Sequence, residues 1–203
     1  MLRTIVAVFG LAALLSSPLA AQTARFSAPA LQIATAVSAL PEQSRAGARV
    51  LGHDAQGKVV ILRPGSNDFT CIADDGVSKQ YHVACYHKSL EAFMARGREL
   101  HAMKKSREAI DSVRGADIKA GRYAMPSRPA ALYQYYASRD SVDASGNVKG
   151  ASYLYVVYTP YATAKSTGIT ENPIEGGPWI MYPGKPWAHL MIAPQKTAAV
   201  TLK

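Results

Sequence analysis

Residues 59–89 read VVILRPGSNDFTCIADDGVSKQYHVACYHKS, and the predicted fold depends on how this stretch pairs with itself. It holds an apolar run at 59–62, a second at 69–73 and a third at 81–87, separated by residues typical of turns. Both cysteines of the chain, Cys71 and Cys85, lie here. Any covalent cross-link built from cysteine must therefore pass through this stretch.

Cys71 and Cys85 are predicted to form a disulfide, because paired cysteines in exported chains usually bond. The register of a tight hairpin argues against this pairing. A two-residue turn at Asp75-Gly76 would pair Cys71 near Gln80 and leave Cys85 roughly 17 Å further along the ladder. A disulfide spans no more than about 7 Å between Cα atoms. The bond therefore requires a wide loop or a second strand that ends before Cys85.

A metal site made of Cys71, His82, Cys85 and His87 is the alternative use of this stretch. These residue types suit zinc or copper. On a regular strand Cys85 and His87 share one face while His82 points to the other, and the spacing is not that of a zinc finger. An oxidised cysteine pair also supplies no thiolate. We therefore predict no metal and no other cofactor.

The first 21 residues have the pattern of a secretion signal. Arg3 supplies the positive charge, residues 5–15 are apolar or small, and residues 19–22 offer a small-residue cleavage site. The apolar run is shorter than the roughly 20 residues of a membrane span, and no later segment is a candidate span. We expect a signal peptide over 1–21 and export to the periplasm or the exterior of a bacterial cell.

The remaining chain is basic and of ordinary composition. The formal net charge is +9, from 23 basic and 14 acidic residues, and 48% of the residues are hydrophobic. Nucleic acid is not expected as a partner of an exported protein, whereas anionic envelope components or acidic glycans are. A solvated basic surface without a partner is the alternative. We expect one domain over 22–193 and a flexible tail over 194–203.

The order of predicted elements indicates an α+β domain. A helix over 30–40 precedes strands at 49–53, 58–63 and 69–73, which are expected to form a three-stranded meander. Residues 89–120 read as two helices, with Ser89 and Ser106 at their starts and a solvated polar face that includes Arg98 and Arg107. Further strands are expected at 132–136, 153–159, 179–182 and 187–192. We predict an antiparallel sheet, formed by the N-terminal meander and the C-terminal strands, with a central helix pair.

Aromatic residues are concentrated on the C-terminal strands. Alternation places Tyr133 and Tyr135 on one face of a strand, and likewise Tyr153 and Tyr155. Such rows of amphipathic rings can stack on a glycan or another ring-bearing ligand. Tyrosine is also a good strand former, so simple packing is the alternative. The predicted ligand-binding residues are Tyr133, Tyr135, Tyr153, Tyr155, Trp179, Trp187 and His189.

His189 is the residue we would choose for acid–base chemistry. It lies among apolar residues that could shift its pKa. The sequence contains none of the motifs G-x-S-x-G, H-E-x-x-H or S-x-x-K that would supply a nucleophile or a metal beside it. A packed structural histidine is the alternative interpretation.

Two segments carry a resemblance to other proteins. Residues 60–71 (VILRPGSNDFTC) resemble a pattern of strand, Gly-x-Asn-x, aromatic, Thr and Cys, and residues 182–189 (YPGKPWAH) resemble a Gly-x-Pro-aromatic-Ala-His segment. Both are similar to segments of a group of small exported bacterial proteins of uncharacterised function. The resemblance implies an envelope location and a shared fold, and it implies no activity and no functional residues.

Three functions follow as hypotheses. The first is a non-enzymatic exported protein that binds a ligand or envelope component through its aromatic sheet and basic surface. The second is an envelope hydrolase that uses His189 with an acidic or hydroxyl partner. The third is a structural domain, cross-linked at Cys71 and Cys85, that binds another protein.

Overall fold

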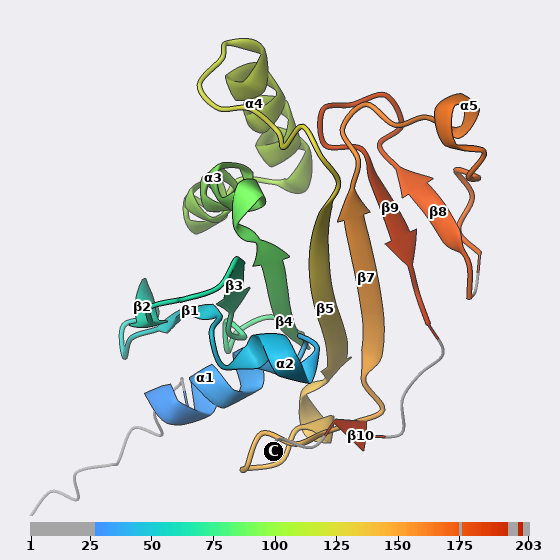
Figure 1. Ribbon diagram of the computed structural model, residues 1–203. Helices are drawn as coiled ribbons and strands as arrows, with labels where there is room; N and C mark the ends of the chain where they lie inside the picture. Colours follow the sequence, from blue (N-terminus) through green and yellow to red (C-terminus); the bar gives the residue numbers. More distant parts are fainter. Residues whose placement is uncertain (1–26, 175, 195–198, 201–203) are drawn as a thin grey trace, which may run out of the picture.

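The computed structural model describes residues 27–174, 176–194 and 199–200 (Figure 1). The predicted signal peptide lies outside these residues. The helices are α1 (Pro29–Val37), α2 (Glu42–Arg45), α3 (Glu91–Ala102), α4 (Arg107–Lys119) and α5 (Ala164–Thr167), with 3-10 turns η1 (Lys88–Leu90) and η2 (Arg139–Ser141). The strands are β1 (Arg49–His53), β2 (Val59–Arg63), β3 (Phe69–Ile72), β4 (Gln80–His87), β5 (Ala130–Ser138), β6 (Val148–Lys149), β7 (Ser152–Tyr158), β8 (Pro178–Met181), β9 (His189–Ile192) and β10 (Ala199–Val200).

One large sheet forms the centre of the molecule. It has eight strands in the order β2-β1-β3-β4-β5-β7-β9-β8, and every neighbouring pair is antiparallel except β1 and β3. The α+β class is thereby confirmed, as is the helix pair between the two groups of strands. Within the predicted tail, 194–203, β10 pairs antiparallel with β6, whereas residues 195–198 and 201–203 lie outside the described part of the chain.

The predicted N-terminal meander is wrong. β1 lies between β2 and β3, antiparallel to the first and parallel to the second. The connection from β2 to β3 therefore crosses the start of β1, where the Ser66 and Asn67 amides donate to the carbonyl of Gly47 at 2.8 and 3.0 Å. Gly65 makes the crossing possible, because a Cβ on this residue would lie only 2.6 Å from the backbone nitrogen of Arg49.

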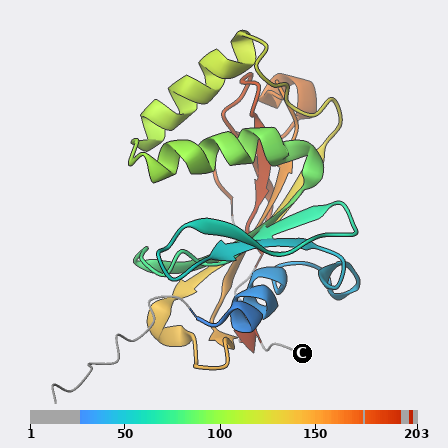
Figure 2. The same ribbon diagram turned by 90° about the vertical axis from the view of Figure 1, so that its left-hand side faces the viewer.

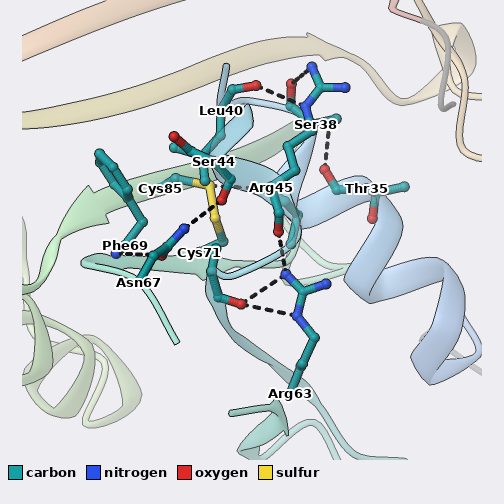
Figure 3. The surroundings of a disulfide bond; sticks show 12 residues. Thr35, Ser38, Leu40, Ser44, Arg45, Arg63, Asn67, Phe69, Cys71 and Cys85 are labelled. Atoms are coloured by element: carbon teal, nitrogen blue, oxygen red, sulfur yellow. Dashed lines mark hydrogen bonds between the residues drawn. A yellow bond between two sulfur atoms is a disulfide. The ribbon is translucent and has the colours of Figure 1, made fainter. Parts of the chain in front are cut away.

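Side chains fasten this crossing to the rest of the domain. Arg63 donates hydrogen bonds to the backbone carbonyls of Arg45 and Ala48. The Asn67 side chain donates to the Ser44 carbonyl at 2.8 Å and accepts from the Phe69 amide at 3.0 Å. Figure 3 shows these bonds grouped around the disulfide. They satisfy carbonyls near α2 that no strand pairs, so the crossing is held by local polar contacts.

The predicted disulfide between Cys71 and Cys85 is present, and a wide loop explains its register. The two cysteines lie directly opposite each other on β3 and β4. Pairing of these strands begins at Ile72 with Ala84, so residues 73–79 form the connection in place of a two-residue turn. Asp74 and Asp75 accept hydrogen bonds from several backbone amides within 76–82 and stabilise this loop.

Each face of the sheet packs against different helices. On the first face, α1 covers a core that includes Val50, Cys71, Cys85 and Tyr135. On the second face, α3 and α4 cover a core that includes Tyr86 and Leu132, among other side chains. Figure 2 shows α3 and α4 at the top of the molecule, above β1, β2 and β3, with α1 in its lower part. Consecutive side chains of each central strand therefore point to opposite faces of the sheet and pack in two separate cores.

Of the two central helices, α4 begins at a side-chain cap and α3 does not. The Ser106 hydroxyl accepts a hydrogen bond from the Ala109 amide at 3.3 Å, as predicted for the start of α4. Ser89 does not cap α3. Residues Lys88–Leu90 form η1, and the His87 ring nitrogen Nδ1 accepts from the Ser89 amide.

Candidate functional site

The predicted ligand-binding tyrosines form a packed cluster on the first face. Tyr133 lies opposite Tyr155, and Tyr135 opposite Tyr153, across β5 and β7. Their ring centroids are 5.9 and 5.3 Å apart, with interplanar angles of 67° and 54°. Tyr135 is fully buried, and only Tyr155, with 36% of its surface exposed, is substantially open to solvent. Rings tilted against each other pack well but present no flat platform for a ligand.

The predicted tryptophans and His189 lie on the other side of the sheet. Trp179 and His189 are on the second face, where they lie opposite Met191 and Tyr158. Trp187 stacks near Phe93 of α3 with 6.3 Å between ring centroids. The sheet therefore separates the predicted set of seven residues into two groups that share no surface.

In the described part of the chain, His189 has no hydrogen-bonded partner of the kind that acid–base catalysis requires. Its side chain is buried, with 7% exposure, and Nδ1 lies 2.8 Å from the backbone carbonyl of Trp187. Burial lowers the pKa of His189 below its ordinary value, although the bond to that carbonyl acts in the opposite direction. Within the described residues, no carboxylate or hydroxyl forms a hydrogen bond with this ring. The geometry is that of a neutral structural histidine with its proton on Nδ1.

The four residues of the alternative metal site are not brought together. Cys71 and Cys85 form the disulfide, and His82 lies on the opposite face of β4. His87 contacts the Ser89 hydroxyl at 2.8 Å and lies 3.9 Å from a carboxylate oxygen of Asp68. In the part of the chain that the structure describes, no group of three or more histidine, cysteine or acidic side chains is arranged to hold a metal.

A groove on the second face is the candidate site. It has a volume of about 440 Å³ and is bounded by β3, β4, β5, β7, β8 and β9, by Met94 and Arg98 of α3 and by Arg107 of α4. Volumes in this range are typical of pockets that enclose a small molecule. Its apolar lining consists of Ile72, Ala84, Met94, Leu132, Leu154, Val156, Met181 and Met191. We refer to it as the second-face groove.

Three polar side chains form a connected cluster in the second-face groove. The Gln134 oxygen Oε1 accepts from His82 Nε2 at 2.9 Å and from the Tyr136 hydroxyl at 3.1 Å. The His82 and Tyr136 rings stack with 4.3 Å between centroids and an angle of 4°. Burial lowers the pKa of His82 and raises the pKa of Tyr136. Both groups are therefore neutral near pH 7, and the cluster works through hydrogen bonds.

Two arginines extend into the second-face groove from the helices. Arg98 of α3 donates to the Tyr86 hydroxyl at 2.6 Å and to Glu91 at 2.8 Å. Arg107, the first residue of α4, donates to the Tyr182 hydroxyl at 3.2 Å. Burial raises the pKa of Tyr86, which donates its own proton to Glu91 at 2.6 Å. The groove thus combines an apolar lining, a neutral polar cluster and two cationic side chains.

A larger hollow elsewhere has a different character. It has a volume of about 510 Å³ and lies between the 121–129 loop and residues 159–161. None of its lining residues is buried, and Arg128 is the one charged side chain among them. It is an open depression between loops, without the buried polar groups that orient a ligand.

Comparisons with known proteins add no relative. No protein-family model, no curated protein and no solved structure matches the chain. The resemblance of residues 60–71 and 182–189 to small exported bacterial proteins therefore stays a prediction. Among the described residues, no helix is both long and apolar enough to cross a membrane.

Several residues of the second-face groove were not predicted as ligand-binding. Gln134, Tyr136, Arg98 and Arg107 lie outside the predicted set, and the sequence suggests His82 only as a metal ligand. The sequence does contain one indication of the groove. Gln134 is a polar side chain that lies between Leu132 and Tyr136 on one face of a strand. Arg98 and Arg107 were attributed to a solvated helix face. Only Arg107, with 68% exposure, fits that description, whereas Arg98 is 23% exposed.

Proposed function

We propose that this chain is an exported, non-enzymatic binding protein that holds a small amphipathic molecule in the second-face groove. The observation that carries the proposal is the cluster of buried Gln134 with half-buried His82 and Tyr136 within an otherwise apolar lining. Convergent polar groups at the floor of an apolar pocket are typical of sites that bind and orient a ligand.

Export is supported by two features of the chain. The leader-like pattern over 1–21 predicts secretion. The Cys71–Cys85 disulfide is of the kind that persists in oxidising compartments. Both favour a periplasmic or extracellular protein of the bacterial envelope, in agreement with the resemblance described above.

The other hypotheses receive less support. A hydrolase would need a carboxylate or hydroxyl bonded to His189, and the ring is bonded to a backbone carbonyl. Glycan stacking on the first face would need a flat exposed platform, and the tyrosine rings there are tilted against each other. Among the described residues, no specific surface favours a partner-binding role. The binding proposal alone accounts for buried polar groups inside the second-face groove.

A neutral fluorescent probe tests the proposal. We expect N-phenyl-1-naphthylamine to bind the purified protein at a single site, with increased emission and an affinity in the micromolar range. The variant Leu154→Trp should weaken this binding at least tenfold, because Leu154 is half-buried and its enlarged side chain would fill the groove. The matched control is Val157→Trp, which adds slightly more bulk at a half-buried position on the first face of the same strand.

The outcomes are distinct. Saturable binding by the wild type and Val157→Trp, with loss in Leu154→Trp, supports a ligand site in the second-face groove. No saturable binding, or equal binding by both variants, would overturn the proposal. Cooperative urea unfolding of all three proteins excludes a loosened core as the source of fluorescence.

A further inference from the structure

The amide of Gln134 leaves two hydrogen-bond donors facing the second-face groove. Its oxygen is occupied by His82 and Tyr136, which both donate to it. The residue is 9% exposed, and within the described chain no hydrogen bond reaches its nitrogen Nε2. The nitrogen itself is reachable by solvent, so it is an accessible hydrogen-bond donor in the wall of the groove. This position therefore favours a ligand whose polar end accepts hydrogen bonds.

The charges around the second-face groove favour a negative ligand. The charged residues in its lining, Arg98 and Arg107, are both cationic. Arg98 pairs with Glu91 at 2.8 Å, but Glu91 also lies 3.6 Å from Arg49. Arg107 lies 3.6 Å from Asp111, but Asp111 also pairs with Arg114 at 2.6 Å. Each of these two carboxylates is shared by two guanidinium groups, so positive charge at the groove remains uncompensated.

We propose that the second-face groove binds an amphipathic monocarboxylate, with the carboxylate at Gln134 and Arg107 and the apolar body along Leu132, Leu154 and Val156. This inference rests on the proposed function and deepens it. A carboxylate accepts hydrogen bonds without donating any, which matches the donors of an amide nitrogen and a guanidinium. The uncompensated positive charge at the groove favours an anion, and the net charge of +9 attracts anions to the molecule.

Competition against N-phenyl-1-naphthylamine tests the inference with three probes that share a twelve-carbon chain. We expect dodecanoate to displace the dye at a concentration about tenfold or more below that of dodecanol, since charge-assisted hydrogen bonds contribute about 1.5–3 kcal/mol. Dodecyltrimethylammonium should compete no better than dodecanol. All three are used below their micelle concentrations.

Two variants locate the carboxylate. Gln134→Glu keeps an oxygen that accepts from His82 and Tyr136 while it replaces the amide donors with a second acceptor. We expect it to remove the preference for dodecanoate over dodecanol, with each competition referred to the dye affinity of the same variant. Arg107→Gln should reduce the preference several-fold. The matched control Lys105→Gln removes the same charge from an exposed residue outside the lining and should leave the preference unchanged.

The results separate this inference from the proposed function. If the dye binds but dodecanoate and dodecanol compete equally, the monocarboxylate assignment is wrong and the binding groove stands. The same conclusion follows if Lys105→Gln lowers the preference as much as Arg107→Gln does. If the dye does not bind in the groove at all, the proposed function itself fails.

Discussion

Cys71 lies directly opposite Cys85 across β3 and β4, with 3.9 Å between their Cα atoms. Both side chains are completely buried beneath α1, and the Cys85 sulfur lies 3.2 Å from the carbonyl of Ala36. The bond therefore joins two strands at the centre of the first-face core and also contacts the helix that covers it.

Replacement of both cysteines, Cys71→Ala with Cys85→Ala, should lower the free energy of unfolding by about 3 kcal/mol. A disulfide that closes a loop of roughly 15 residues restricts the unfolded chain by about this amount. Urea unfolding followed by far-ultraviolet circular dichroism measures the change. Because the bond is buried, a reductant should act on the wild type only when urea is also present. An unchanged unfolding midpoint in the double variant would contradict the prediction.

Gly65→Ala should destabilise the protein far more than Gly97→Ala. A Cβ at position 65 would lie 2.6 Å from the Arg49 nitrogen and 3.0 Å from its Cα, which are backbone atoms of β1 and cannot move aside. At position 97 it would meet only the end of the Arg114 side chain at 3.1 Å, and alanine is the better helix former by about 1 kcal/mol. We expect a loss of more than about 2 kcal/mol for Gly65→Ala and a change within about 1 kcal/mol for Gly97→Ala.

Thermal and urea unfolding of the two glycine variants gives the comparison directly. Equal stabilities would show that the crossing over β1 tolerates a side chain. In that case, the close approach of Gly65 to Arg49 would not explain why β1 lies between β2 and β3.

The residue ranges of the first three strands could be predicted from the sequence, but which strands pair with one another in the sheet could not. Alternating apolar residues and turn residues locate β1, β2 and β3 to within one residue at each end, because these signals are local. The order of the strands depends on a contact between Gly65 and Arg49 and on bonds from Ser66 and Asn67 to Gly47. The spacing of apolar residues within one segment does not indicate such contacts between distant segments.

The candidate site was predictable only in its residue types. Aromatic strands and a lone histidine suggested a binding surface, but alternation assigns faces only within each strand. The pairing of Tyr158 with His189 puts His189 and Trp179 on the face opposite to Tyr133 and Tyr155. Arg98 and Arg107 line the second-face groove because α3 and α4 pack over the second face of the sheet. The periodicity of a helix does not specify this tertiary arrangement.

Stability should decrease as the pH falls from 7.5 to 5, because buried histidines of the folded protein resist protonation. Burial lowers the pKa of His53, His82 and His189 below the value of about 6.5 for an unfolded chain. Below that pH the unfolded chain binds more protons than the folded one, so the free energy of unfolding decreases as the pH is lowered. Each histidine contributes a slope of at most about 1.4 kcal/mol per pH unit.

Urea unfolding at half-unit intervals across this window measures the slope, and two variants assign part of it to the second-face groove. His82→Phe keeps a ring against Tyr136 but removes the titrating group, so its slope should be smaller than that of the wild type. Tyr136→Phe alters the same cluster without removing a histidine and should keep the wild-type slope. Aspartate and glutamate titrate near pH 4 and contribute little in this window. If His82→Phe and the wild type lose stability in parallel, His82 is not held neutral by its burial beside Gln134.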